Sequence, residues 1–394
     1  MRDAGDGHIP FDVLLGGVPR FEAESLWAWR VARRCLAALP ACGRTWRRGV
    51  RPTVADLEGT SPLVLVQADP EAYLPPLAAR RLLHLAGSGE VDVAVPVSNE
   101  PWSEATRSEP PFPYHTPSLL EEAARAVAAT GGGLRREGPI RSPVFAARRE
   151  ALSGFPGDLP LDAAVERAAD LGRRVRVDPG AYLHRYGEMD GQAREDLAAR
   201  VPEGSRVVLD VGCSGGATAA ALRRAGVSEI VGIEPDPEDA AEAARRYDRV
   251  LAMPLEAVSE DFEGRFDAIL FGDVLEHLED PSAALLRVRP WLSGRGAVIA
   301  SVPNVGHWSV IADLLQGRFD YVPYSILSGT HVRFFTRRTL IDLFEACGFE
   351  VPRIQAVRFS PSPFGVTALE KLRSLPGASE DLDAVEFIAV AGRR

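Results

Sequence analysis

The sequence predicts an α/β protein of two domains, of which the second is built on a doubly wound parallel sheet. The chain has 394 residues, which is more than one hydrophobic core usually organises. From residue 206 onward, short apolar runs alternate regularly with helical patterns. Strands that alternate with helices pair in parallel through right-handed crossovers, and such sheets bind ligands beyond the carboxyl ends of their strands.

The domain boundary is expected where a polar stretch, residues 186–192, precedes a helical pattern at 193–201. This divides the chain into domains 1–185 and 186–394. In the first domain, residues 63–66 and 91–95 are expected strands, and residues 74–85 and 119–129 are expected helices. The Pro-rich segment 98–118 has no hydrophobic periodicity and is expected to be a long surface loop. The first domain is therefore predicted to be a smaller α/β domain.

Composition narrows the functional classes. The formal net charge of −10 gives no electrostatic reason to expect a polyanion, since nucleic-acid binding normally needs a basic patch, so we expect no nucleic-acid partner. The four cysteines form no CxxC pair and no zinc-ligand spacing with histidine, so neither disulfides nor a metal site is expected. No apolar run reaches the roughly 18 residues of a membrane span, and the protein is expected to be cytoplasmic. The sequence leaves open whether the protein forms a homo-oligomer.

The second domain shows its elements in a regular order. The predicted strands and helices alternate as strand 207–211, helix 217–225, strand 229–233, helix 238–247, strand 266–271, helix 282–291 and strand 296–302.

A glycine-rich turn follows the first of these strands, in the segment Asp210-Val211-Gly212-Cys213-Ser214-Gly215-Gly216. Glycine lets the backbone turn sharply and approach a ligand closely. The spacing differs from the dinucleotide pattern G-x-G-x-x-G, and no Gly-Lys-Ser/Thr phosphate loop is present. Nicotinamide and nucleoside triphosphate cofactors are therefore disfavoured.

Acidic residues follow the next strands. Glu234 lies about twenty residues after the glycines, where a carboxylate can accept both hydroxyls of a ribose. A third buried strand runs directly into polar residues that include Asp273, Glu276 and His277.

Taken together, these motifs resemble the class I S-adenosylmethionine-dependent methyltransferases, in the branch associated with sugar and cell-surface glycan modification. The resemblance implies a Rossmann-like seven-stranded sheet that ends in an antiparallel hairpin, with residues 350–357 and 385–391 as the last strands. It implies S-adenosyl-L-methionine as cofactor. The implied cofactor-binding residues are Asp210, Gly212, Cys213, Gly215, Glu234, Pro235, Met253, Asp273, Glu276 and His277.

The family commonly has a Gly-Asp pair after the third strand whose carboxylate meets the adenine amine, whereas this chain has Ala252-Met253-Pro254-Leu255-Glu256. Either Met253 packs against adenine or Glu256 replaces the aspartate. Cys213 is interpreted as a small packing residue of the loop.

The acceptor side is expected after the fifth strand. Methyl transfer is an in-line displacement, so the enzyme aligns the nucleophile and, for a hydroxyl, removes its proton. Histidine suits that task because its ordinary pKa is close to neutrality. His307 and His331 are the candidate bases, with hydrogen bonding to backbone or substrate as the alternative role. Asn304, Trp308 and Arg333 are the candidate substrate-binding residues.

Residues 62–185 loosely resemble the later part of family 2 glycosyltransferases. Those enzymes need paired acids that hold a divalent metal, and here only Asp69 stands where such a pair would be. The first domain is therefore predicted to be a degenerate glycosyltransferase-like domain. Asp158 and Asp162 are the candidate catalytic acids if it is active.

The predicted function is an S-adenosylmethionine-dependent methyltransferase that O-methylates a saccharide or another small polar acceptor in glycan or natural-product biosynthesis. One alternative is a bifunctional glycosyltransferase-methyltransferase. The other is a non-catalytic binding partner in glycan assembly.

Overall fold

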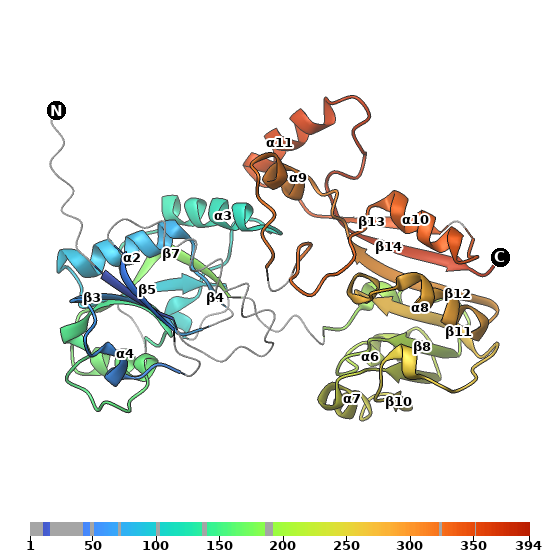
Figure 1. The fold of residues 1–394 in the computed structure, drawn as a ribbon, viewed down its shortest axis with the longest axis horizontal. Coiled ribbons are helices and arrows are strands. Elements are labelled where there is room, and N and C mark those ends of the chain that lie inside the picture. Colours follow the sequence, from blue (N-terminus) through green and yellow to red (C-terminus); the bar gives the residue numbers. More distant parts are fainter. Residues whose placement is uncertain are drawn as a thin grey trace. The chain divides into compact units, whose positions relative to one another are not determined.

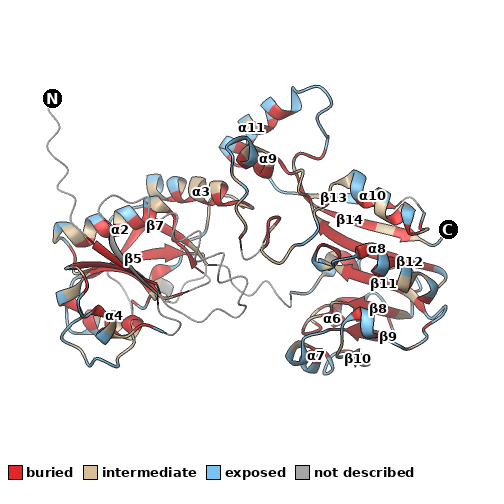
Figure 2. Ribbon diagram, in the orientation of Figure 1, coloured by how far each residue is buried: buried red, intermediate tan, exposed pale blue. Residues whose placement is uncertain are grey.

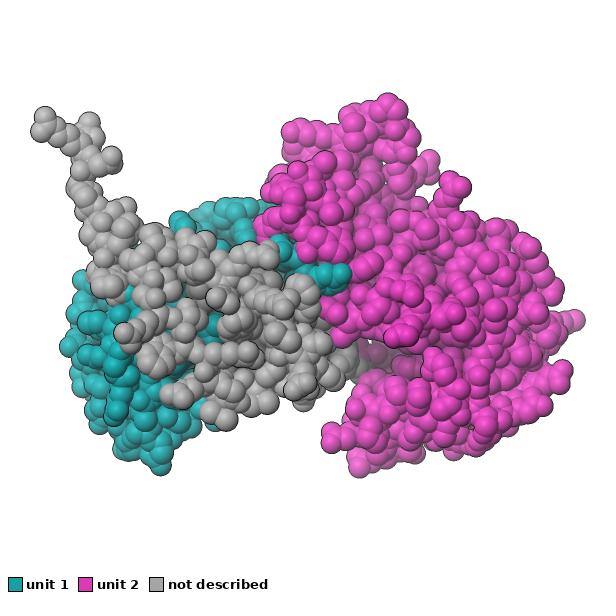
Figure 3. Space-filling model, in the orientation of Figure 1, with its two compact units in different colours: residues 1–187, 320–324 teal, residues 188–319, 325–394 magenta. Residues whose placement is uncertain are grey.

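The computed structural model describes residues 11–15, 42–47, 51–69, 72–99, 103–135, 140–185, 192–322, 325–350 and 352–394. The chain forms two compact units, shown in different colours in Figure 3. Unit 1 is Met1–Gly187 with Asp320–Tyr324, and unit 2 is Glu188–Phe319 with Ser325–Arg394. No helix in these described ranges has the length and apolar character needed to cross a membrane.

Unit 1 is built on a mixed sheet in the order β2-β1-β3-β6-β5-β7-β4 (Figure 1). Its strands are β1 Phe11–Leu15, β2 Cys42–Arg47, β3 Leu63–Gln67, β4 Ala72–Tyr73, β5 Val93–Ser98, β6 Val144–Arg148 and β7 Val175–Arg185. Its helices are α2 Pro76–Ser88, α3 Pro117–Thr130 and α4 Leu161–Asp170. β6 runs antiparallel to both of its neighbours, β3 and β5. The predicted strands and helices of this half are present with shifted ends, and the predicted loop 98–118 contains a 3-10 turn at Glu104–Thr106.

Unit 2 is built on a sheet in the order β10-β9-β8-β11-β12-β14-β13. Its strands are β8 Val207–Val211, β9 Glu229–Ile233, β10 Arg249–Leu251, β11 Phe266–Gly272, β12 Leu292–Pro303, β13 Arg353–Arg358 and β14 Ala384–Gly392. Its helices are α5 Glu195–Ala198, α6 Ala219–Arg224, α7 Pro237–Ala243, α8 Pro281–Val288, α9 Trp308–Leu315, α10 Arg337–Ala346 and α11 Pro363–Arg373. β14 runs opposite to the other strands of this sheet and pairs antiparallel with both β12 and β13, and the predicted Rossmann-like fold is confirmed.

The strand order places a switch point at β8. The chain passes from β8 to β9 and β10 on one side, and then returns to β11 on the other side. Val211 pairs with Ile233 of β9 and with Phe271 of β11. The residues that follow these three strands therefore emerge side by side at one edge, which is where doubly wound sheets bind ligands.

Each unit has a hydrophobic core of its own. Both sheets are buried between helices whose outer faces are exposed (Figure 2). The central strand β11 contributes Phe266, Ile269 and Phe271, which are almost fully buried in the main core of unit 2. Such runs of apolar residues form strands covered on both faces, which is typical of parallel sheets between helices.

Candidate active site

The glycine turn after β8 is held against its two neighbours. The N–H groups of Gly212 and Cys213 donate to the carbonyl of Ile233, at 2.8 and 3.2 Å. Gly212 has a φ of 69°, and a Cβ at this position would lie 2.6 Å from Cγ2 of Val274. Only glycine can adopt this conformation and this close approach without strain. The turn and the segment after β11 therefore touch at Gly212.

Glu234 is oriented by backbone donors. Its Oε2 accepts the N–H of Ser214 at 2.8 Å, and its Oε1 accepts the N–H of Asp236 at 2.9 Å. Burial raises the pKa of Glu234, while these two backbone N–H groups lower it. A carboxylate oxygen has further acceptor capacity after one hydrogen bond. Glu234 can therefore accept a pair of ribose hydroxyls from a fixed position.

Asp210 is a buried carboxyl with one side-chain donor. Burial raises its pKa to about 6, and the Tyr247 hydroxyl, which donates to Oδ2 at 2.6 Å, opposes that shift. Tyr247 was not singled out in the sequence, because a tyrosine 37 positions downstream carries no motif signal. The Tyr247 hydroxyl therefore holds the Asp210 carboxyl at the end of β8, two residues before the glycine turn begins.

A charged network surrounds Asp273, which has a left-handed φ of 54°. Its backbone N–H and its Oδ1 both bond the hydroxyl of Ser301, at 3.0 and 2.9 Å. Arg194 forms ion pairs with Asp273, with Asp196 and, at 2.7 Å, with Glu386. Burial raises the pKa of Glu386 to about 7, and the charge of Asp273 adds to that shift. Sequence reasoning missed Arg194, Ser301 and Glu386, because they come from distant segments that meet only in the folded sheet.

Three side chains with metal-ligand chemistry meet beside this network. One potential ligand atom from each of Glu276, His277 and His331 lies within 4.8 Å of the others. The rings of His277 and His331 contact edge to face, with centroids 4.8 Å apart. The carbonyl of Glu276 accepts the N–H groups of Val332 and Arg333, at 2.9 and 3.0 Å, which ties the loop that carries His331 to this place. Burial raises the pKa of Glu276 well above its ordinary range and lowers that of His331 to about 4.

His307 lies in a different setting from His331. It is the N-cap of α9, and its Nδ1 accepts the N–H of Ser309 at 3.3 Å and contacts that residue's hydroxyl at 2.7 Å. Only 3% of His307 is exposed. These contacts match the alternative role expected for His307, which is hydrogen bonding to the backbone. The role of His307 as a general base stays a prediction, and these contacts do not favour it.

The three predicted substrate-binding residues have structural contacts. Asn304 donates to the carbonyls of Asp381 and Ala384, and its Oδ1 accepts the N–H of Gly306. Trp308 is buried, and a Cβ on Gly365 would lie 2.5 Å from its ring. Arg333 is exposed and donates to the carbonyls of Val332 and Glu279. Acceptor contacts by Asn304 and Trp308 stay a prediction that their burial does not favour.

The remaining predicted cofactor residues line the same edge. Met253 is half-buried against the core, whereas Glu256 and Pro235 are exposed. Gly215 lies near the Glu242 carboxylate, which a Cβ would approach to 3.2 Å. Cys213 is buried, and burial raises the pKa of its thiol, so it packs as an uncharged side chain.

In unit 1, the predicted acids are held by arginines. Asp69 is buried and forms an ion pair with Arg185 at 2.8 Å. Asp162 is buried and forms ion pairs with Arg51 and Arg141, whereas Asp158 is exposed. These contacts place cations on two of the acids that a metal-dependent glycosyltransferase would use.

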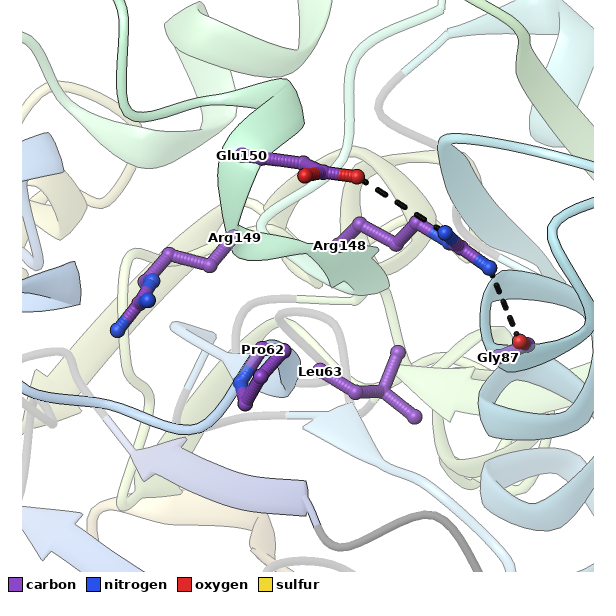
Figure 4. A pocket seen from close by; sticks show the side chains of 6 residues that line it. All are labelled: Pro62, Leu63, Gly87, Arg148, Arg149 and Glu150. Carbon is purple, nitrogen blue, oxygen red and sulfur yellow. Dashed lines mark hydrogen bonds and ion pairs between the residues drawn. The ribbon is translucent and has the colours of Figure 1, made fainter.

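A surface pocket of about 280 Å³ in unit 1 is lined by Pro62, Leu63, Gly87, Arg148, Arg149 and Glu150 (Figure 4). Arg148 donates to the carbonyls of Ala86 and Gly87 at the end of α2, at 3.0 and 3.1 Å. Basic side chains commonly satisfy the last carbonyls of a helix. The pocket lies at the start of β3, opposite the edge that holds Asp69, so we assign no ligand to it.

The switch point of unit 2 thus combines the glycine turn after β8, the oriented Glu234 carboxylate and the polar cluster after β11. The sheet that carries them includes one antiparallel strand, β14. These features define an α/β domain that binds a nucleoside cofactor and presents it to a second substrate.

Comparison with known proteins identifies the family. A model described as a methyltransferase domain matches residues 182–353. A ubiquinone biosynthesis O-methyltransferase of Cereibacter sphaeroides is 31% identical over 178 residues, which cover 42% of this chain and 69% of that protein. The human mitochondrial ubiquinone biosynthesis O-methyltransferase is 27% identical over 165 residues, covering 39% of this chain and 44% of that protein. The chain belongs to the S-adenosylmethionine-dependent methyltransferase family, and its cofactor is S-adenosylmethionine.

Solved structures with a similar fold include a methyltransferase of Archaeoglobus fulgidus, 17% identical with a TM-score of 0.38, covering 50% of this chain and 94% of that chain. Another is a Burkholderia thailandensis 1,6-didemethyltoxoflavin-N1-methyltransferase with bound S-adenosylhomocysteine. It is 21% identical with a TM-score of 0.34, and the match covers 50% of this chain and 75% of that chain.

Proposed function

We propose that unit 2 transfers a methyl group from S-adenosylmethionine to a hydroxyl oxygen of a small polar acceptor. The cofactor supplies a methyl group on a sulfonium sulfur, which is a good leaving group. The observation that carries the proposal is the fixed Glu234 carboxylate beside a turn in which Gly212 leaves no room for a Cβ. This arrangement fits a ribose and an extended chain lying across the glycine turn.

Roles for the other side chains follow from their positions. Glu234 would bind the ribose hydroxyls, and the half-buried Met253 would pack against adenine. Arg194, bonded to Asp273 and Ser301, would hold the segment after β11 beside the reacting methyl group. The enzyme would thereby align the acceptor oxygen with the methyl group, since alignment is the main requirement of a displacement reaction.

For the acceptor, the proposal names only the atom that receives the methyl group, which is oxygen. The relatives named above are O-methyltransferases of ubiquinone biosynthesis, which supports oxygen as the methylated atom. A saccharide acceptor rests only on the motifs of the sequence. Methyl transfer from isotope-labelled S-adenosylmethionine to matched phenolic and saccharide acceptors would separate the two classes.

Calorimetric titration with S-adenosylmethionine and S-adenosylhomocysteine tests the cofactor site. We expect Glu234→Ala to weaken binding at least tenfold, because two ribose hydrogen bonds to a charged group contribute about 1.5–3 kcal/mol each. Glu238→Ala, which removes an exposed acid four positions later, is the matched control and should bind as the wild type does. Equal binding by both variants would refute the assigned role of Glu234.

For unit 1 we propose a glycosyltransferase-like domain without transferase activity. The ion pair between Asp69 and Arg185 supports this, because the Arg185 guanidinium is bonded to the carboxylate that would otherwise hold a metal ion. Manganese-dependent transfer or hydrolysis of a nucleotide sugar by the full chain would overturn it and support the bifunctional alternative.

A further inference from the structure

We propose that Glu386, on β14, makes the cofactor site bind S-adenosylmethionine in preference to its product, S-adenosylhomocysteine. Glu386 would act as a specificity-determining residue, because its negative charge lies beside Asp273 at the edge where the sulfonium of the cofactor binds. The inference rests on the proposed placement of the cofactor along the glycine turn.

Glu386 reaches the ligand-binding edge of the sheet on a strand that runs opposite to the others. It pairs in register with Pro303, the last residue of β12, because β14 is antiparallel to β12. β12 lies beside β11, whose last residue, Gly272, pairs with Ser301. Glu386 therefore lies at the carboxyl ends of the parallel strands, close to the segment that begins with Asp273.

Three carboxylates share one guanidinium at this edge. Arg194 donates from Nε and Nη2 to Asp196, at 3.0 and 2.9 Å, and from Nη2 to Glu386 at 2.7 Å. Its Nη1 donates to Asp273 and, at 3.0 Å, to the hydroxyl of Ser301. These contacts use all five N–H groups of a guanidinium, and ionised carboxylates outnumber the cation. We call these five residues the Arg194 cluster.

A further carboxyl group acts on this cluster and has no donor. Glu276 is 1% exposed, and within the described part of the chain neither Oε1 nor Oε2 has a hydrogen-bond partner. Burial raises its pKa, and the charges of Asp273 and Glu386 raise it further. A buried carboxyl group without a donor is costly, so such groups are normally paired or hydrogen bonded. The acidic side chains at this edge therefore favour a ligand that brings positive charge.

The substrate form of the cofactor differs from the product form by one positive charge. S-adenosylmethionine carries a sulfonium, whereas the sulfur of S-adenosylhomocysteine is neutral after the methyl group has left. The segment after β11 touches the glycine turn, since a Cβ on Gly212 would lie 2.6 Å from Val274, the residue after Asp273. A cofactor that crosses this turn brings its sulfonium near partly buried charges, which salt screens little.

The charge of Glu386 changes close to neutral pH. Burial raises its pKa to about 7, the charge of Asp273 adds to that shift, and Arg194 opposes it. Asp196 and Glu276 are the other charged groups that act on Glu386, and the residues in register with it on β12 and β13 are uncharged. Above its pKa Glu386 is ionised and attracts the sulfonium, and below its pKa it is neutral and loses that preference.

Calorimetric titration of the full-length chain with both ligands tests the inference. The measured quantity is the ratio of the dissociation constant of S-adenosylhomocysteine to that of S-adenosylmethionine. Glu386→Gln keeps the shape of the side chain without its charge, and should lower this ratio about threefold to tenfold above neutral pH. Glu386→Asp keeps the charge and should retain most of the ratio. Glu370→Gln makes the same change at an exposed acid of α11 and should match the wild type.

A pH series on the wild type gives a second readout that does not depend on the folding of any variant. The ratio should rise between about pH 6 and pH 8, because Glu386 becomes ionised in this range. Glu386→Gln should lose most of that rise. A wild-type ratio that stays constant with pH would contradict the role of Glu386.

An unchanged ratio in Glu386→Gln, or equal weakening of both ligands, would overturn the inference, because a merely structural role affects both ligands alike. Glu234→Ala separates this outcome from failure of the proposed function. It should weaken both ligands equally, since they share the ribose. Wild-type binding by Glu234→Ala would refute the proposed placement of the cofactor. Weaker binding of both ligands by Glu234→Ala, with no change of ratio in Glu386→Gln, would refute only the role of Glu386.

Discussion

At the scale of single residues, the cofactor turn depends on a backbone conformation and on a close approach. Gly212 combines a φ of 69° with a position where a Cβ would lie 2.6 Å from Val274. A left-handed conformation costs roughly 1–2 kcal/mol for a residue with a Cβ, and the contact adds steric strain. One methyl group therefore tests whether the turn is as tightly fitted as the structure shows.

Gly212→Ala is expected to lower the free energy of unfolding by about 1–3 kcal/mol and to weaken S-adenosylhomocysteine binding at least tenfold. The double variant Gly212→Ala with Val274→Ala should regain part of the stability, because it removes the atoms that clash. Urea unfolding and calorimetry measure both effects. A single variant as stable as the wild type would contradict the close contact.

Tyr247→Phe tests the buried Asp210. Removing the hydroxyl should raise the pKa of Asp210 above its value of about 6, because burial would then act without that donor. A carboxyl whose pKa is higher in the folded than in the unfolded protein stabilises the fold at pH values below its unfolded pKa, which is near 4. This stabilisation is lost as the pH rises through the folded pKa. Carbon NMR of the carboxyl should show the higher midpoint, and an unchanged midpoint would contradict the assignment.

At the scale of elements, Asp381 joins segments around β13 and β14. It pairs with Arg337 at the start of α10, at 2.5 and 2.8 Å, and with Arg358 at the end of β13, at 3.0 Å. Its carbonyl also accepts from Asn304, which follows β12. One residue thus ties together the segment after β12, the start of α10 and the end of β13.

Asp381→Asn should lower the free energy of unfolding at pH 7 by about 1 kcal/mol, since both guanidiniums are partly exposed and screened by water. The hydrogen bonds from Arg337 lower the pKa of Asp381, so its contribution is present above the unfolded value near 4 and is lost as pH falls through the folded pKa. Urea midpoints of wild type and variant should therefore converge in acid. Asp342→Asn, at an exposed position of α10, is the control and should match the wild type throughout.

At the scale of the molecule, the two units have separate cores. The described hydrophobic clusters of unit 2 begin at Leu197, and those of unit 1 end at Leu183. A unit with its own core and its own sheet can in principle fold alone.

Residues 188–394 expressed alone should bind S-adenosylhomocysteine with the affinity of the full chain, because the proposed cofactor contacts lie within unit 2. The same fragment with Glu234→Ala serves as the control and should bind at least tenfold more weakly. A folded fragment that binds much more weakly than the full chain would show that unit 1 contributes to the site.

The sequence by itself determined the fold class of unit 2, because strand and helix periodicity and the glycine turn are local signals. Strands β8 and β9 have the predicted ends, and the predicted last strands pair as β13 and β14. The three-residue strand β10 gave no periodic signal of its own, because it is too short.

Only the tertiary structure decided which side chains meet. His331 lies on a loop more than fifty residues after Glu276 and His277, and backbone hydrogen bonds of this loop to Glu276 bring the three side chains together. Arg194 forms ion pairs with Asp273 and Glu386, which lie still further from it along the chain. Periodicity describes neighbours along the chain, whereas a site at a sheet edge gathers residues from the ends of several strands and loops. The sequence therefore indicated the cofactor, while the meeting of Glu276, His277 and His331 became visible only in the folded chain.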